Sequence, residues 1–172
     1  ATVERISYFL KGYDLVGPGI DSRTTVFFNP HKTSDKVVRD LDSASVELVW
    51  ISSKREDADR KIVHRISQEM AVLSPANTSF VLISSDKDFR NQIKLLTSAG
   101  YQVYVIHDAR HENWKLSLEM HATKAFKWMD VIDLKDDDLK NYRTDSNSST
   151  SGDGVGVSPG KHRREIEKAK AA

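Results

Sequence analysis

The sequence predicts an α/β fold, a three-layer α/β/α sandwich built on a parallel sheet of four to five strands. Over residues 1–134, short apolar runs alternate with amphipathic helical segments. Strands separated by helices are joined by right-handed crossovers, which make neighbouring strands parallel. Residues 80–83 form a continuous apolar run between turn residues, which is typical of a central parallel strand because helices cover both of its faces.

Each expected element follows from its own local pattern. Helices are predicted where apolar residues recur every three or four positions, and strands where β-branched and aromatic residues run together. Turn residues separate the elements, most clearly at Gly17-Pro18-Gly19, at Ser74-Pro75 and at Gly100. In chain order we expect a helix around residues 3–10, a strand at 24–28, a helix opened by Ser34, a strand at 46–51, a helix at 56–73, a strand at 80–83, a helix at 89–99, a strand at 102–106 and a helix at 114–128.

The composition limits the kinds of protein that this chain can be. With 172 residues, 38% of them hydrophobic, it is long enough for one domain with a real core. It contains no cysteine, which excludes disulfides and thiolate metal sites and agrees with an intracellular location, cytoplasmic or nuclear. No apolar run approaches the roughly 20 residues that span a bilayer. The net charge of +1 means that any binding of nucleic acid must come from local basic patches.

The character of the sequence changes near residue 135, and we expect three parts. Residues 1–134 carry the alternating pattern and form the folded domain. Residues 135–160 are rich in Ser, Thr, Gly, Asp and Asn and predict a flexible polar linker. Residues 161–172 form a basic, charged tail, which is either solvated or in contact with RNA.

Acidic side chains follow two of the expected strands. Asp86 and Asp88 come directly after the strand at 80–83, and Asp59 lies near the start of the helix that follows the strand at 46–51. Because parallel strands end at one edge of a sheet, these three carboxylates are expected to converge there. Three carboxylates together favour a divalent cation, Mg²⁺ or Mn²⁺. The structural alternative is that Asp88 is a helix N-cap and Asp86 a solvated turn residue.

Three segments resemble the NYN domain, a family of PIN-like ribonucleases, and within it the limkain type found in the meiosis regulator and mRNA stability factor. They are residues 55–62 (Arg-Glu-Asp-Ala-Asp-Arg-Lys-Ile), residues 74–77 (Ser-Pro-Ala-Asn) and residues 81–89 (Val-Leu-Ile-Ser-Ser-Asp-Lys-Asp-Phe). The resemblance spans about residues 1–134. It implies that Asp59, Asp86 and Asp88 are catalytic metal ligands and that the substrate is single-stranded RNA. Ser85 stands where the family usually has Gly or Thr.

The chain departs from the family at its beginning. The family opens with a central strand whose aspartate is the first metal ligand, whereas Ala1–Ile6 resembles the helix after that strand. Loss of that strand is expected to leave a gap flanked by unpaired backbone groups. Two functions therefore stay open: a metal-dependent endoribonuclease, or a catalytically degraded NYN domain that binds RNA or protein partners. A Toprim-like metal fold is a third option, but no suitable glutamate is evident on an earlier strand.

Basic residues flank both acidic segments. Lys54, Arg55, Lys87 and Arg90 are predicted to contact RNA phosphates, although ordinary charge alternation on exposed helices would give the same pattern. His107 follows the strand at 102–106 and is a weaker candidate for phosphate contact, the alternative being a surface histidine. The three tryptophans are interpreted as packing residues rather than as base-stacking platforms.

Overall fold

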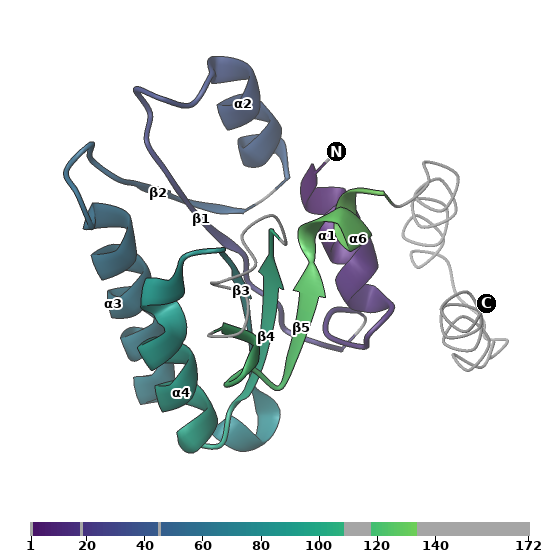
Figure 1. Ribbon diagram of the computed structural model, residues 1–172. Helices are drawn as coiled ribbons and strands as arrows, with labels where there is room; N and C mark the ends of the chain where they lie inside the picture. Colours follow the sequence, from purple (N-terminus) through teal and green to yellow (C-terminus); the bar gives the residue numbers. More distant parts are fainter. Residues whose placement is uncertain (1, 18, 45, 109–117, 134–172) are drawn as a thin grey trace, which may run out of the picture. The chain divides into compact units, whose positions relative to one another are not determined.

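The computed structural model describes residues 2–17, 19–44, 46–108 and 118–133. Chain contacts divide the protein into two compact units, one formed by residues 1–22 with 131–172 and the other by residues 23–130. Figure 1 labels the helices and strands, which are described here unit by unit. The expected linker and basic tail, residues 135–172, lie outside the described residues. Within the described ranges, no helix has both the length and the apolar character that crossing a membrane requires.

The first unit contains helix α1 (Thr2–Lys11) and the end of helix α6 (Trp128–Ile132). The expected opening helix is confirmed. Leu10 and Val131 are buried, and Arg5 donates a hydrogen bond from Nη1 to the carbonyl oxygen of Ile132 at 2.8 Å. Since Arg5 and Ile132 lie at opposite ends of the described chain, this bond ties the two ends together.

The described residues of the second unit form five strands, and every pair of neighbouring strands is parallel. Strand β1 (Thr25–Phe28) pairs with β2 (Glu47–Trp50). Strand β3 (Ser79–Ile83) pairs with β4 (Gln102–His107), which also pairs with β5 (Lys124–Lys127). The predicted α/β class with parallel strands is thereby confirmed.

The strands form two sheets, β1-β2 and β3-β4-β5, rather than one continuous sheet. Within the described chain, no strand pairs the two sheets with each other. Among the described residues, the two sheets are thus separated by the gap in strand pairing that the sequence predicts.

Helix α3 (Asp57–Val72) connects the two sheets within this unit. On the side of the first sheet, Arg65 forms an ion pair with Glu47 of β2. On the side of the second sheet, Ile62 and Ile66 pack against the core. Helix α3 starts after β2 and ends before β3, so its first turn, which carries Asp57 and Asp59, lies at the carboxyl end of β2.

The core lies between the second sheet and helices α3 and α4 (Arg90–Ser98), which Figure 1 shows on one side of that sheet. Its partly buried members from α3 recur every three or four residues, as the amphipathic pattern predicts. Gly100 ends the helical segment with a φ of +91°, a left-handed conformation that favours glycine. The buried core residues are Phe89, Ile93, Leu96, Tyr101, Val103, Val105 and Leu118.

The predicted helix at 114–128 is wrong in its second half. Residues 124–127 form β5, which continues the sheet beside β4, and helix α6 begins only at Trp128. The four residues pair in parallel with Tyr104–His107 of β4. Just before them, the backbone N–H of Thr123 donates a hydrogen bond to the carbonyl oxygen of Val103 at 2.7 Å. Residues 109–117, the first part of the predicted helix, lie outside the described residues.

Helix α2 (Asp35–Ser43) follows Ser34, as expected. The conformation of Ser34 is extended, which suits an N-cap, but its side chain makes no capping hydrogen bond. The short turn η1 (Pro75–Asn77) interrupts the chain between α3 and β3, where the sequence predicts a stop.

Candidate functional site

Asp86 is positioned by the turn that follows β3. The chain leaves the strand and enters a short 3₁₀ turn, η2 (Lys87–Phe89), for which Asp86 is the N-cap. The Asp86 Oδ1 atom accepts a hydrogen bond from the backbone N–H of Asp88 at 2.9 Å, and the backbone N–H of Asp86 donates to Ser84 Oγ at 3.1 Å. The interpretation of Asp88 as the cap and Asp86 as a solvated turn residue is therefore wrong. One Asp86 oxygen serves the cap, and the second is not needed for it.

Asp57, at the start of α3, has a structural role. Its Oδ2 atom accepts a hydrogen bond from the backbone N–H of Ser52 at 2.6 Å and lies 3.5 Å from Lys61 Nζ. The Ser52 hydrogen bonds, and to a lesser extent the charge of Lys61, lower the pKa of Asp57 below 3.8. Asp57 thus has a structural role, because it closes the loop between β2 and α3.

We expect Asp57→Asn to lower the midpoint of thermal unfolding at pH 7. The folded state holds the charged form of Asp57, so its contribution is present above pH 3.8 and is lost as the pH falls through the lower pKa of the folded state. Unfolding curves of both proteins between pH 2 and pH 7 measure this difference, which should shrink only below about pH 3.8. A difference that stays constant across this range would contradict the role of the charge.

Asp59 lies two residues further along α3, and its pKa is shifted in the opposite direction to that of Asp57. Partial burial, followed by the charges of Asp86, Asp88 and Glu56, raises the pKa of Asp59 above 3.8. The two aspartates after β3 therefore lie close enough to act electrostatically on an aspartate in the preceding helix. Folding brings these three carboxylates into one acidic cluster, composed of Asp59, Asp86 and Asp88.

The acidic cluster is not arranged as a closed metal cage. Among the described residues, no group of three or more His, Asp and Glu side chains is placed so that it could hold a metal ion. Mg²⁺ nevertheless keeps several waters and is commonly bound through one or two carboxylates together with substrate phosphates. The hard oxygen donors and their mutual repulsion therefore fit Mg²⁺ or Mn²⁺, whereas the ligand geometry is not preformed.

The four predicted RNA-contacting residues are exposed and flank the acidic cluster in sequence. Lys54 and Arg55 precede α3, and Lys87 and Arg90 lie on either side of Asp88. The Arg55 Nε atom is 3.7 Å from Glu56 Oε1, a surface pair that contributes little to stability. These positions suit contact with phosphates, and their role in binding RNA stays a prediction.

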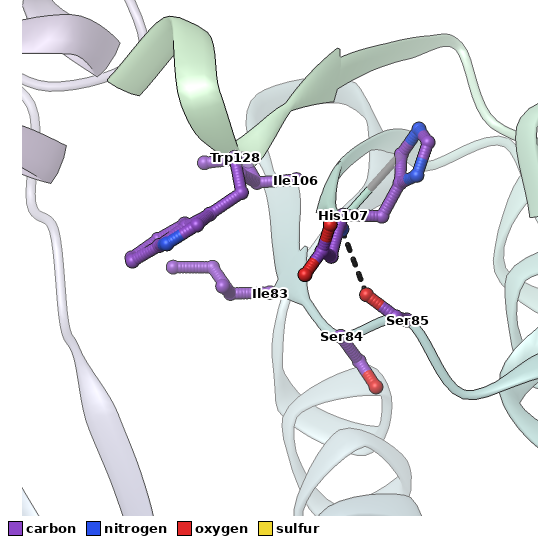
Figure 2. A pocket seen from close by; sticks show the side chains of 7 residues that line it. Ile83, Ser84, Ser85, Ile106, His107 and Trp128 are labelled. Carbon is purple, nitrogen blue, oxygen red and sulfur yellow. Dashed lines mark hydrogen bonds between the residues drawn. The ribbon is translucent and has the colours of Figure 1, made fainter. Parts of the chain in front are cut away.

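His107 is not the surface histidine that its position in the sequence indicates. Only 3% of its surface is exposed, and its Nε2 atom lies 2.8 Å from Glu119 Oε1. This distance is that of an ion pair, but the contact does not meet the geometry of a hydrogen bond. Figure 2 shows the imidazole pointing away from Trp128.

A cavity of about 260 Å³, wide open to solvent, lies at the carboxyl ends of β3 and β4. Ser85, which lines it, is the residue before Asp86 in the chain. The sequence does not predict this cavity directly, because its lining comes from three separate segments. Its place at the sheet edge could have been inferred, because parallel strands bring the residues after β3, β4 and β5 to one edge of the sheet. Figure 2 shows the lining, which consists of Ile83, Ser84, Ser85, Ile106, His107, Asp108 and Trp128.

Two of the three tryptophans can be placed. Trp128 is half-buried and lines the cavity, so it is more than a packing residue. Trp50, at the end of β2, is 68% exposed, so its interpretation as a packing residue is wrong. Trp114 lies outside the described residues.

The fold and the acidic cluster define a class of protein: an α/β domain with carboxylates gathered where parallel strands end, as in nuclease-type folds that act with divalent cations. The family model of the NYN domain matches residues 5–125, and the chain therefore belongs to the NYN domain family. This family has a PIN-like, nuclease-type fold. No curated protein matches the chain.

Proposed function

We propose that this chain is a metal-dependent endoribonuclease domain that cleaves single-stranded RNA at its acidic cluster. The observation that carries the proposal is that Asp86 and Asp88, which follow β3, lie near enough to Asp59 on α3 for their charges to act on it. Carboxylates that repel one another in the folded protein favour a site for a cation, because a bound cation removes the repulsion. Membership of the NYN family supports a nuclease activity at this site.

In this proposal Asp59, Asp86 and Asp88 hold Mg²⁺ or Mn²⁺ and are the catalytic residues. The cation, when bound, supplies an activated water and neutralises charge that develops on the phosphodiester. The capping hydrogen bond from the backbone of Asp88 fixes the orientation of the Asp86 carboxylate, so that its second oxygen is presented in one direction.

The exposed basic residues on both sides of the acidic cluster would bind the RNA backbone. Lys54 and Arg55 come from the loop before α3, and Lys87 and Arg90 come from the segment after β3. Phosphate contacts of this kind position the chain without reading its sequence. We also propose the limkain type as the branch of the family, on the resemblance of residues 55–62 and 81–89.

A cleavage assay tests this function directly. The full chain is incubated with end-labelled single-stranded RNA, or with the matched duplex, in Mn²⁺, in Mg²⁺ or in EDTA. We expect internal cleavage of the single strand in the presence of a divalent cation and none in EDTA. Binding of RNA without cleavage in any cation would replace the enzyme with the RNA-binding module, and the absence of both would overturn the proposal.

A further inference from the structure

Trp50 presents an aromatic ring to solvent at the carboxyl end of β2. Its exposed fraction is 68%, and in the described part of the chain no other Phe, Tyr or Trp side chain is exposed. Single exposed apolar residues are common, so exposure alone assigns no role to this ring. Its position is more informative, because the ligands of parallel α/β sheets gather beyond the carboxyl ends of the strands.

The backbone that carries the ring is fixed by contacts from β1 and α3. Phe28 of β1 lies opposite Trp50 in the register, and the carbonyl oxygen of Phe28 accepts a hydrogen bond from the N–H of Ile51 at 2.9 Å. Lys61 of α3 donates a hydrogen bond from Nζ to the carbonyl oxygen of Trp50 at 2.5 Å. A ring on a backbone that is already ordered loses little conformational freedom when it binds a ligand.

Two loops leave the sheet at this end and are tied together. Residues 29–34 follow β1, and residues 51–56 follow β2. Because β1 and β2 are paired in parallel, the two loops start side by side. Asn29 donates a hydrogen bond from Nδ2 to Ser53 Oγ at 2.9 Å, which joins one loop to the other. The ring therefore lies at the border of a surface that both loops form.

These two loops carry a net positive charge. Their cations are Lys32, Lys54 and Arg55, which are all exposed, and their only anion is Glu56. The side chain of Arg55 is 94% exposed although its Nε atom lies 3.7 Å from Glu56 Oε1, so the guanidinium stays open to a second anion. Exposed lysine and arginine bind the phosphates of nucleic acids whatever the sequence. The charge of the loops therefore favours a polyanion as the ligand of this surface.

The area of the ring decides between a base and a protein partner. An aromatic side chain buries roughly 150–250 Å² when it is fully covered. A stable interface between proteins buries about 800 Å² on each partner. One ring supplies only a fraction of that area, whereas it is large enough for one base. Stacking of a base on an aromatic ring tolerates all four bases, because each of them has a π-face.

We propose that Trp50 is a stacking platform for one unpaired base of an RNA strand whose phosphates contact the loops after β1 and β2. The inference rests on the proposed function, because the loop after β2 leads directly into the helical turn that carries Asp59 (Figure 1). The platform holds the strand beside the acidic cluster and favours single strands, whose bases are free to stack on a side chain. Trp50 is thus a positioning residue, and Lys32 is a phosphate contact in addition to Lys54 and Arg55.

Tryptophan fluorescence in EDTA measures this binding without any cleavage. The chain has three tryptophans, so the substitutions Trp114→Phe and Trp128→Phe leave Trp50 as the only one. The full chain with these two changes is titrated with a short single strand of mixed sequence, with the same sequence paired in a hairpin, and with an abasic ribose-phosphate strand of equal length. We expect saturable quenching by the intact single strand and little quenching by the other two.

Substitutions of the ring separate stacking from apolar contact. Anisotropy of a labelled single strand in EDTA measures the affinity of each variant. Trp50→Ala should weaken binding by about 5-fold to 150-fold, the loss expected when one base is no longer stacked on an aromatic ring. Trp50→Tyr keeps an aromatic face and should fall between, whereas Trp50→Leu keeps apolar area without such a face and should resemble Trp50→Ala. Val72→Ala is the matched control, because Val72 is 76% exposed at the other end of α3.

Lys32→Ala tests the phosphate contact of the loop after β1. The variant should bind the intact and the abasic strand more weakly by the same factor, because a phosphate contact does not depend on the base. The slope of log affinity against log salt concentration should become shallower by about 0.7, the value for one phosphate of a single strand. Lys94→Ala removes an exposed lysine of α4 and serves as the control.

The outcomes distinguish this inference from the function on which it rests. An unchanged affinity of Trp50→Ala, or equal binding of the intact and the abasic strand, would overturn the platform even if the chain cleaves RNA. Binding that depends on Trp50 without any cleavage in Mn²⁺ would overturn the nuclease and leave the platform standing. A change in the sedimentation of Trp50→Ala at unchanged affinity for RNA would assign the ring to an interface between copies of the chain instead.

Kinetics separate a positioning role from a structural one. In Mn²⁺, Trp50→Ala should raise the RNA concentration that gives half the maximal rate and leave the rate at saturation unchanged, because stacking acts on bound substrate and transition state alike. A fall in the rate at saturation would contradict this role. Thermal unfolding of every variant excludes loss of the fold as the cause of weaker binding.

Discussion

Asp86→Asn is expected to abolish cleavage of single-stranded RNA while the fold stays intact. The Asn side chain keeps an oxygen that can accept the capping hydrogen bond from the backbone of Asp88, so the turn after β3 is preserved. The substitution removes the negative charge that a cation requires. We expect the rate at saturating Mn²⁺ to fall by at least roughly 100-fold, as for the loss of one strong electrostatic contact in a reaction centre.

The controls make this result specific. Asp88→Asn removes a second charge of the acidic cluster and should lower the rate as well. Asp40→Asn removes the charge of an exposed aspartate on α2 and should leave the rate unchanged. Single-turnover cleavage of one labelled RNA, with the circular dichroism spectrum of each protein, measures both effects. If Asp86→Asn and Asp40→Asn were equally active, the acidic cluster would have no role in the reaction.

The Asp59→Asn variant is expected to be more stable than the wild type in EDTA and less stable than the wild type in Mn²⁺. Burial and the charges of Asp86 and Asp88 raise the pKa of Asp59 above 3.8, so the folded chain binds its proton more tightly than the unfolded chain does. Stability therefore falls as the pH rises from 3.8 through the raised pKa, and the ionised carboxylate opposes folding at pH 7. Asn lacks this charge and escapes the penalty.

A cation reverses the order because it binds the folded wild type. At a Mn²⁺ concentration of 100 times the dissociation constant, the gain in unfolding free energy is about 2.7 kcal/mol. Asp59→Asn has lost one ligand, so it gains less at the same concentration. Thermal unfolding with EDTA or Mn²⁺, at pH 3 and pH 7, measures the reversal, and the difference in EDTA should vanish at the lower pH. The same gain from Mn²⁺ in both proteins would place the cation elsewhere.

Most helices and strands were predictable because their signals are local. The apolar run before Asp86 and the helical spacing in α3 each identify an element without reference to the rest of the chain. β5 was missed because its four residues lie inside a longer segment with a helical pattern, and only pairing with β4 makes them a strand. The caps were misassigned for a related reason. Asp86 and Asp88 are both good capping residues, and the direction of the chain after β3 decides between them.

The candidate site also has a part that the sequence predicts and a part that it does not. Residue type and position after a strand identify Asp59, Asp86 and Asp88, and in the structure the charges of Asp86 and Asp88 act on Asp59. The cavity was not predicted, because no pattern in the sequence links Ile83 to Trp128. The burial of His107 was likewise invisible, since its contact with Glu119 joins two segments whose approach depends on the packed sheet.

The sequence by itself determined the α/β class, the order of most elements and the acidic residues, because periodicity, turn residues and charge act over a few neighbouring positions. The tertiary structure alone decided that the strands form two sheets and that Trp128 lines a cavity. It also decided that Asp57 closes a loop, while Asp59 lies within range of the charges of two other aspartates. These features depend on contacts between residues far apart in the chain. Such contacts are selected by the packing of the whole unit, and no short stretch of sequence encodes them.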